Sequence, residues 1–227
     1  RDFPEVEEMV RFQGRERTLF KNGDIGFYET KVYYADSTIF NVFTHKFVEG
    51  NAAKSLTEPN SIVISKALAK KYFGKNPAVG KTLKTVYDLY KVTGVIEDVP
   101  KNSHLVFDML ISASTILGNN RDGDNWGNFN YFTYVLLKPG TNAEAFNKKL
   151  IPMYDKYMAP IFAAFNVKMK YGVQPITEIH LHSKLEREPE ELGNMSYIWI
   201  FSAVAFFMLL IACINYMNLT TARSARR

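Results

Sequence analysis

The stretch from Tyr197 to Met217 limits what this chain can become more than any other. It reads YIWIFSAVAFFMLLIACINYM, carries no charge, and has Ser202 and Asn215 as its only clearly polar residues. At a rise of about 1.5 Å per residue, about 20 helical residues cross a hydrocarbon core about 30 Å thick. The alternative, a core helix of a soluble domain, normally keeps one polar stripe, and here apolar residues occupy every face. We therefore expect one transmembrane helix at residues 197–217.

The charges on the two sides of this span predict its orientation. The last thirty residues contain no acid, and three arginines follow the span: Arg223, Arg226 and Arg227. On the other side, residues 186–191 are acidic on balance. Because positive residues close to a span tend to stay in the cytoplasm, residues 1–196 are predicted to lie outside it, and residues 218–227 inside.

Polar residues at the two ends of the span predict how the helix begins and packs. Ser196 is a suitable N-cap, and Tyr197 would lie with its ring at the outer interface. Asn215 and Asn218, spaced i,i+3 near the inner end, are predicted to hydrogen-bond a neighbouring membrane helix. For Asn218, emergence into the lipid headgroups is the alternative.

Charge gives no support for a nucleic-acid partner, and the cysteine content excludes a disulfide within the chain. The chain has 28 basic and 23 acidic residues, but three of the basic ones are the arginines after the span, which leaves 25 against 23 in residues 1–196. A nearly neutral domain gives no electrostatic reason to expect nucleic acid as a partner. The single cysteine, Cys213, lies inside the span, so no disulfide can form within the chain. Because the chain begins at Arg1, we interpret it as a piece of a longer protein.

The pattern before the span predicts an α+β domain, because strands and helices alternate irregularly. A helical turn is predicted at Phe3–Glu8, a hairpin turn at Asn22–Asp24 and an extended segment at Pro175–Ser183. Two helices have clear start signals: Lys66–Phe73 after Ser65, and one from a capping box at Thr141 to about Tyr157. A third, shorter helix is expected after Asp36–Thr38. The predicted strands are Met9–Gln13, Phe27–Ala35, Ser61–Ser65, Thr82–Val86, Tyr90–Val99, Asp108–Ala113, Tyr131–Lys138 and Val167–Val173.

Three motifs resemble functional sites and are better explained otherwise. Gly74–Thr82 resembles a phosphate loop, but five residues separate its glycines instead of four, one is a proline, and a helix precedes it where a strand is required. His180 and His182 would share one face of an extended segment, yet a zinc site needs a third ligand. Residues 118–127, rich in Gly, Asn and Asp, indicate a surface loop. No catalytic, metal or cofactor-binding set is predicted.

Several segments, in the same order, resemble one known family. They are Phe3–Glu7, Asn60–Ala69, Tyr72–Gly74 with Asn76–Pro77 and Val79–Lys81, and Val92–Pro100, and they are similar to the periplasmic core domain of MacB/FtsX-type ABC transporter permeases. The ending Ile211–Ser224 is similar to the second transmembrane helix of the same family. The resemblance covers nearly the whole chain.

This resemblance implies an extracytoplasmic domain at 1–196 with two α/β lobes of the Porter and Sabre kind, the inserted lobe at about residues 37–99. It implies a bacterial inner-membrane protein, a further span before Arg1 and two after Arg227. The implied partners are a cytoplasmic ABC ATPase, which would carry the only enzymatic activity, a second permease subunit, membrane lipid and a periplasmic adaptor. The implied function is transmission of ATP-driven movement during efflux of antimicrobial peptides, macrolides or lipoprotein-type substrates.

Two other classes stay open at this point. An extracytoplasmic sensing domain of a membrane receptor would also be α+β, with one exit helix and basic residues inside. A membrane-anchored hydrolase is less favoured, because no serine, cysteine or lysine stands beside a base in a recognisable nucleophile motif.

Overall fold

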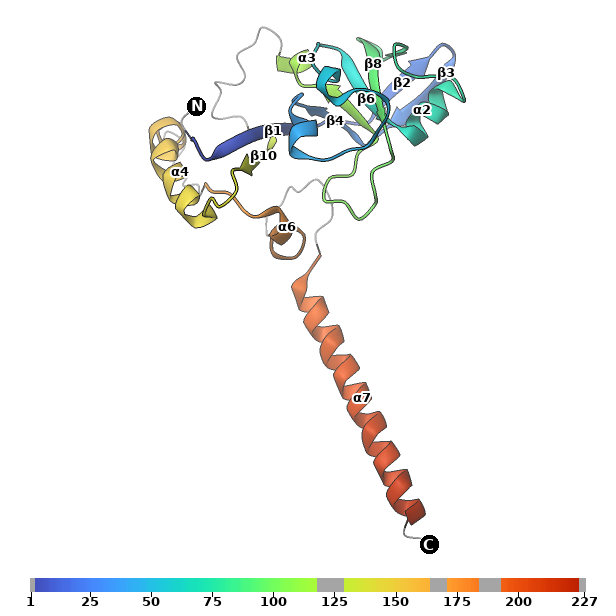
Figure 1. Ribbon diagram of the computed structural model, residues 1–227, viewed down its shortest axis with the longest axis vertical. Coiled ribbons are helices and arrows are strands. Elements are labelled where there is room, and N and C mark those ends of the chain that lie inside the picture. Colours follow the sequence, from blue (N-terminus) through green and yellow to red (C-terminus); the bar gives the residue numbers. More distant parts are fainter. Residues whose placement is uncertain (1–2, 118–128, 164–170, 184–192, 225–227) are drawn as a thin grey trace. The chain divides into compact units, whose positions relative to one another are not determined.

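The computed structural model describes residues 3–117, 129–163, 171–183 and 193–224. The chain divides into two compact units, Arg1–Val173 and Gln174–Arg227. Within the described residues the first unit holds one mixed ten-stranded sheet, and the second holds two helices (Figure 1).

The sheet of the first unit is built from strands of three to nine residues. Its spatial order is β10-β1-β4-β9-β6-β8-β7-β2-β3, and β5 pairs with β8 beside this path. Two pairs are parallel, β4 with β9 and β6 with β8, and the others are antiparallel. The strands are β1 (Val6–Gly14), β2 (Thr18–Asn22), β3 (Ile25–Glu29), β4 (Val32–Ala35), β5 (Phe47–Gly50), β6 (Ser61–Ser65), β7 (Thr82–Lys84), β8 (Leu89–Ile96), β9 (Met109–Ser112) and β10 (Phe132–Leu137).

The helices of the first unit are short, except for one. They are α1 (Ile39–Val42), a 3-10 turn η1 (Ala52–Lys54), α2 (Lys66–Phe73), α3 (Ser114–Leu117), α4 (Ala143–Tyr157) and α5 (Ala159–Ala163). The second unit contains α6 (Ile176–His182) and α7 (Met195–Ser224). Figure 1 shows α2 beside β2 and β3 at one end of the sheet domain, and α4 beside β1 and β10 at the other.

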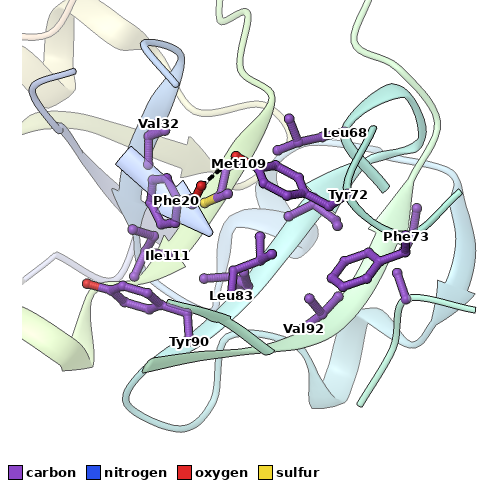
Figure 2. Packing of buried hydrophobic residues seen from close by; sticks show 14 residues of the cluster. Phe20, Val32, Leu68, Tyr72, Phe73, Leu83, Tyr90, Val92, Met109 and Ile111 are labelled. Atoms are coloured by element: carbon purple, nitrogen blue, oxygen red, sulfur yellow. Dashed lines mark hydrogen bonds between the residues drawn. The ribbon is translucent and has the colours of Figure 1, made fainter. Parts of the chain in front are cut away.

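Both faces of the sheet carry a core. The cluster in Figure 2 fills one face, where Leu68, Tyr72 and Phe73 of α2 pack over Phe20, Leu83 and Val92 of the strands. The cluster on the other face includes Phe12, Ile39, Leu56, Val63 and Leu110. Strand β6 supplies both clusters and is buried along its whole length. A strand covered on both faces reads as a continuous apolar run, which agrees with the sequence of β6.

Strand β6 and helix α2 form where their local sequence predicts them. The Ser65 hydroxyl accepts a hydrogen bond from the backbone N–H of Leu68 at 3.2 Å, the geometry of an N-cap. The helix ends at Gly74, whose φ of 65° few other residues adopt without strain. The hairpin turn between β2 and β3 is also at the predicted place, with Gly23 at a φ of 58°.

Three sequence predictions in this unit are wrong in part. The predicted helical turn at Phe3–Glu8 is limited to a turn at Pro4–Glu5, closed by the N–H of Val6 on the carbonyl of Phe3 at 3.1 Å, since β1 begins at Val6, which pairs with Leu137 of β10. The predicted strand Phe27–Ala35 is two strands with a break at residues 30–31. The cap of α4 is Asn142, not Thr141, because the Asn142 side chain accepts from the N–H of Ala145 at 3.0 Å.

Two predictions fall partly or wholly outside the described residues. The surface loop at 118–127 lies outside them, as do residues 167–170 of the predicted strand Val167–Val173. The described remainder, Tyr171–Val173, is not a strand: the backbone of Val173 bonds instead to the side chain of Asn147. The inserted lobe at about residues 37–99 stays a prediction.

Candidate membrane anchor and its junction

Helix α7 is longer than the predicted span of 197–217. It contains 30 residues, and its mean hydropathy in the most apolar 18-residue window is 2.5. At about 1.5 Å per residue a helix of this length reaches about 45 Å, which exceeds a hydrocarbon core of about 30 Å. No described residue of α7 is buried. Length and composition make α7 a candidate membrane span, and it is longer than a hydrocarbon core requires.

The first turn of α7 is capped by Asn194, which corrects the prediction for Ser196. The Asn194 side chain accepts a hydrogen bond from the N–H of Ser196 at 2.8 Å, and its backbone carbonyl accepts from Tyr197 at 3.0 Å. Ser196 is therefore the second residue of the helix. Asn and Ser are nearly equal as N-caps, so composition alone does not choose between neighbouring candidates.

The segment before α7 is a second helix, although an extended exit is predicted for Pro175–Ser183. Helix α6 occupies Ile176–His182, with Pro175 at its N-cap position. Because this segment is helical, the extended backbone from which a shared face of His180 and His182 was predicted is absent. No group of three or more metal-ligating side chains occurs in the described part of the chain.

Gly193 joins the two helices of the second unit. Its backbone N–H donates to the carbonyl of His180 at 2.8 Å. A Cβ at this position would lie 3.0 Å from both the His180 ring and a methyl of Leu181, so glycine permits this close approach. Together with the cap at Asn194, this contact ties the end of α6 to the first turn of α7.

The inner end of α7 contains a feature that the sequence analysis missed. The hydroxyls of Thr220 and Thr221 both donate to the carbonyl of Met217 at 2.8 Å. Threonine in a helix is known to bond back in this way, so the Thr-Thr pair was the available signal. Arg223 lies in the last turn, while Arg226 and Arg227 lie outside the described residues. The roles of Asn215, Asn218 and these arginines stay predictions.

The Gly74–Thr82 segment in the first unit has its backbone donors occupied. The N–H groups of Ala78 and Val79 both donate to one carboxylate oxygen of Glu49, at 2.9 and 3.1 Å. The N–H of Gly80 donates to the carbonyl of Val92 at 2.8 Å. A phosphate loop needs such N–H groups free to converge on the ligand. Here they bind the protein's own carboxylate, which makes the segment a structural turn.

A pocket of about 420 Å³ in the first unit is lined by groups that are already paired. The Arg11 guanidinium makes two hydrogen bonds to Asp36, at 2.9 and 3.0 Å, and this pairing raises the pKa of Arg11. Asp36 also accepts from the N–H of Arg11, and the Thr38 hydroxyl donates to the carbonyl of Met9 at 2.5 Å. These bonds attach the start of α1 to β1, so the pocket has a structural explanation.

Comparisons with known proteins agree with this arrangement. Residues 1–152 match the family model of the MacB-like periplasmic core domain. A solved domain of a protein described as a permease from Porphyromonas gingivalis is 25% identical, with a TM-score of 0.60 over 69% of this chain and 72% of that one. The periplasmic region of MacB from Actinobacillus actinomycetemcomitans is 14% identical, with a TM-score of 0.51 over 74% and 79%, which supports the fold alone. No significant match was found among curated proteins.

The family match covers most of the sheet domain and ends within α4, whereas α6 and α7 follow it in the chain. The mixed α+β architecture is confirmed, and the candidate span follows the domain as the sequence predicts. The chain therefore belongs to the MacB-like periplasmic core domain family and represents the extracytoplasmic domain of a MacB-like ABC transporter permease, followed by one candidate transmembrane helix.

Proposed function

We propose that this chain transmits ATP-driven conformational change from the cytoplasm to the extracytoplasmic domain. The movement would originate in the cytoplasmic ABC ATPase with which a permease of this family operates, and would pass through α7. A second permease subunit and a periplasmic adaptor are the further partners proposed here. Efflux of an antimicrobial peptide, a macrolide or a lipoprotein-type substrate is the proposed outcome.

The observation that carries this proposal is the hydrogen-bonded junction at the outer end of α7. A helix that only anchors a domain can end in a free tether, because a flexible linker holds the domain equally well. Here the capped end of α7 is joined through Gly193 to α6, at the carbonyl of His180. A hydrogen-bonded junction of this kind makes α6 move together with α7. Family membership favours this function over that of a receptor's sensing domain.

The test is an insertion that makes the junction flexible. Six Gly/Ser residues placed after Glu191 in the full transporter are expected to leave membrane insertion and ATP hydrolysis intact. ATP-dependent movement of the extracytoplasmic domain is expected to be lost, since a flexible segment absorbs displacement. The movement is measured by energy transfer from a dye on a cysteine at position 101 to acceptor lipid in nanodiscs, with Cys213 replaced by serine.

The control is the same insertion after Asn102, in an exposed turn of the first unit. It adds the same length and composition without interrupting the path to α7, so the ATP-dependent signal is expected to persist. A transporter with the insertion after Glu191 that keeps the full ATP-dependent signal and its normal ATPase activity would show that this segment does not transmit force.

A further inference from the structure

Strand β3 ends the sheet and leaves one row of backbone groups without a neighbouring strand. It pairs with β2 in a regular register from Thr18–Glu29 to Asn22–Ile25, with no bulge. A two-residue hairpin closes on a hydrogen-bonded pair, so Ile25 and Phe27 exchange their backbone bonds with β2. The backbone groups of Gly26 and Tyr28 then face away from the sheet. In the described part of the chain no strand pairs with this side of β3.

This edge lacks most of the devices by which proteins normally protect a free strand. Such edges are usually blocked by lysine or proline on the strand, by a bulge, by an inward-pointing charge, or by extreme shortness. The one charged residue of β3, Glu29, is its last residue and is paired with Lys71. Strand β3 reads IGFYE and is regularly paired over five residues. Ile25, Phe27 and Tyr28 are 49%, 37% and 57% exposed. An unprotected apolar edge of this kind is a template for strand addition.

The two faces beside this edge differ in chemistry. On the face covered by α2, Phe27 packs against the ring of Tyr72 with 5.5 Å between centroids. On the open face, Lys21 of β2 lies directly opposite Lys84 of β7, and Lys91 follows on β8. Arg17 stacks on Tyr28 with 4.5 Å from its guanidinium carbon to the ring centroid. On the α2 face an added strand would meet Ile25 and Phe27, with the Lys71 ammonium 4.4 Å from the Phe27 ring centroid and paired with Glu29. On the other face it would meet positive charge that is unpaired within the described residues.

The positive charges of the open face have no acid beside them on the same strands. None of the ion pairs in the described residues involves Arg17, Lys21, Lys84 or Lys91, and β2, β7 and β8 contain no Asp or Glu. Like charges directly opposite each other on neighbouring strands destabilise a sheet. An added strand would lie about 10 Å from β2, two strand spacings away, within reach of a lysine side chain. Acidic side chains on that strand would relieve the repulsion.

We propose that β3 is the docking edge for an extended segment of a partner protein whose residues alternate between acidic and apolar. Its apolar residues would continue the face of Ile25 and Phe27, and its acids would face Lys21 and Arg17. Charge argues against a second copy of this chain as the occupant. Pairing β3 with β3 would place two sets of Arg17 and Lys21 on either side of the joined edges, with no acid between them.

The test uses a fluorescein-labelled peptide of alternating Glu and Val, seven residues long, and the full chain in nanodiscs of neutral lipid. Anisotropy is expected to show binding that weakens as salt rises from about 50 to about 500 mM. The double variant Lys21→Glu, Lys84→Glu is expected to bind at least about ten-fold more weakly, and to gain affinity for an alternating Lys-Val peptide. This reversal separates a charge effect from loss of folding.

Two further variants complete the design. Tyr28→Pro removes an outward N–H without removing a bond to β2, and is expected to abolish binding of either peptide. Lys101→Glu with Lys148→Glu changes the same charge at exposed sites elsewhere in the first unit and is expected to bind as the wild type does. Absence of peptide binding, or equal binding by all variants, would overturn the proposal. So would a dimer in sedimentation that Tyr28→Pro converts to monomer, which would assign the edge to a second copy.

Discussion

The two units of this chain use apolar side chains in opposite ways. In the sheet domain Phe20, Ile62 and Leu83 are fully buried between strands and α2. In α7, Phe201 and Leu209 are 68% and 66% exposed. A soluble domain rarely presents a continuous apolar surface of that size to water. The difference shows that the sheet domain generates its own apolar interior, whereas the apolar side chains of α7 face outward, as expected of a candidate membrane span.

Polar side chains also have different kinds of hydrogen-bond partner in the two units. In the sheet domain they pair across long distances in sequence: buried Glu29 accepts from Lys71 and from the Tyr72 hydroxyl, both at 2.8 Å. Burial of the Tyr72 hydroxyl, together with its hydrogen bond to Glu29, raises the pKa of Tyr72. In α7 the threonine hydroxyls near the inner end bond to the helix's own backbone. Local bonding of this kind needs no partner outside the helix.

The difference between the two units predicts the largest loss of stability when an aromatic side chain in the core of the sheet domain is truncated. Phe20→Ala is expected to lower the free energy of unfolding by about 3–5 kcal/mol, because it leaves a cavity beside Tyr90 and α2. The matched truncation Leu209→Ala in α7 is expected to cost less than about 1 kcal/mol in the same assay. Urea unfolding in detergent, followed by the circular dichroism of the sheet, measures both. Equal losses for the two variants would contradict the division of roles.

Features with local signals were predictable from the sequence. The span follows from its length and lack of charge, and α2 follows from Ser65, the apolar spacing of Leu68 and Tyr72, and Gly74. Each of these signals lies within a few residues of the structure it determines. The family resemblance added the domain type, which the comparisons confirm.

Features decided by distant residues could not be predicted in this way. Nothing near Ala78 indicates that its N–H would bind Glu49, 29 residues earlier. The order of strands in the sheet likewise depends on pairings such as β1 with β10. At the candidate site, Asn194 and Ser196 are equally good caps by type, and only the geometry of Gly193 on α6 selects Asn194.

A smaller effect is expected at the cap of α7, where the second unit depends on a local side chain. Asn194→Ala removes the acceptor for the N–H of Ser196 and is expected to destabilise the first turn by about 1 kcal/mol. Amide hydrogen exchange at Ser196 and Tyr197 would then be about five-fold faster, while the sheet domain is unaffected. Asn194→Asp keeps the acceptor and serves as the control. Unchanged exchange in the alanine variant would mean that this cap does not hold the helix end.

The smallest expected effect concerns pH and is confined to the sheet domain, because it depends on the half-buried His45. His45 packs between Phe40 and Phe107, with ring centroids 6.1 and 5.2 Å away. Burial lowers the pKa of His45 below its ordinary value of about 6.5. As pH falls through that ordinary value, the unfolded chain binds a proton that the folded chain resists. Stability that is fully present above it is therefore lost toward acid.

His45→Phe keeps an aromatic ring at this position and removes the titration. Between about pH 7.5 and 5.5 the melting temperature of the wild type is expected to fall further than that of this variant. His180→Gln, at an exposed position in the second unit, is the control, and its pH dependence is expected to match the wild type. The wild type and His180→Gln both keep His45 and His45→Phe lacks it, so a difference of His45→Phe from both of them isolates His45. If His45→Phe loses as much stability toward acid as the wild type, the half-buried His45 ring does not couple folding to pH, and its contacts with Phe40 and Phe107 are those of an ordinary packed aromatic.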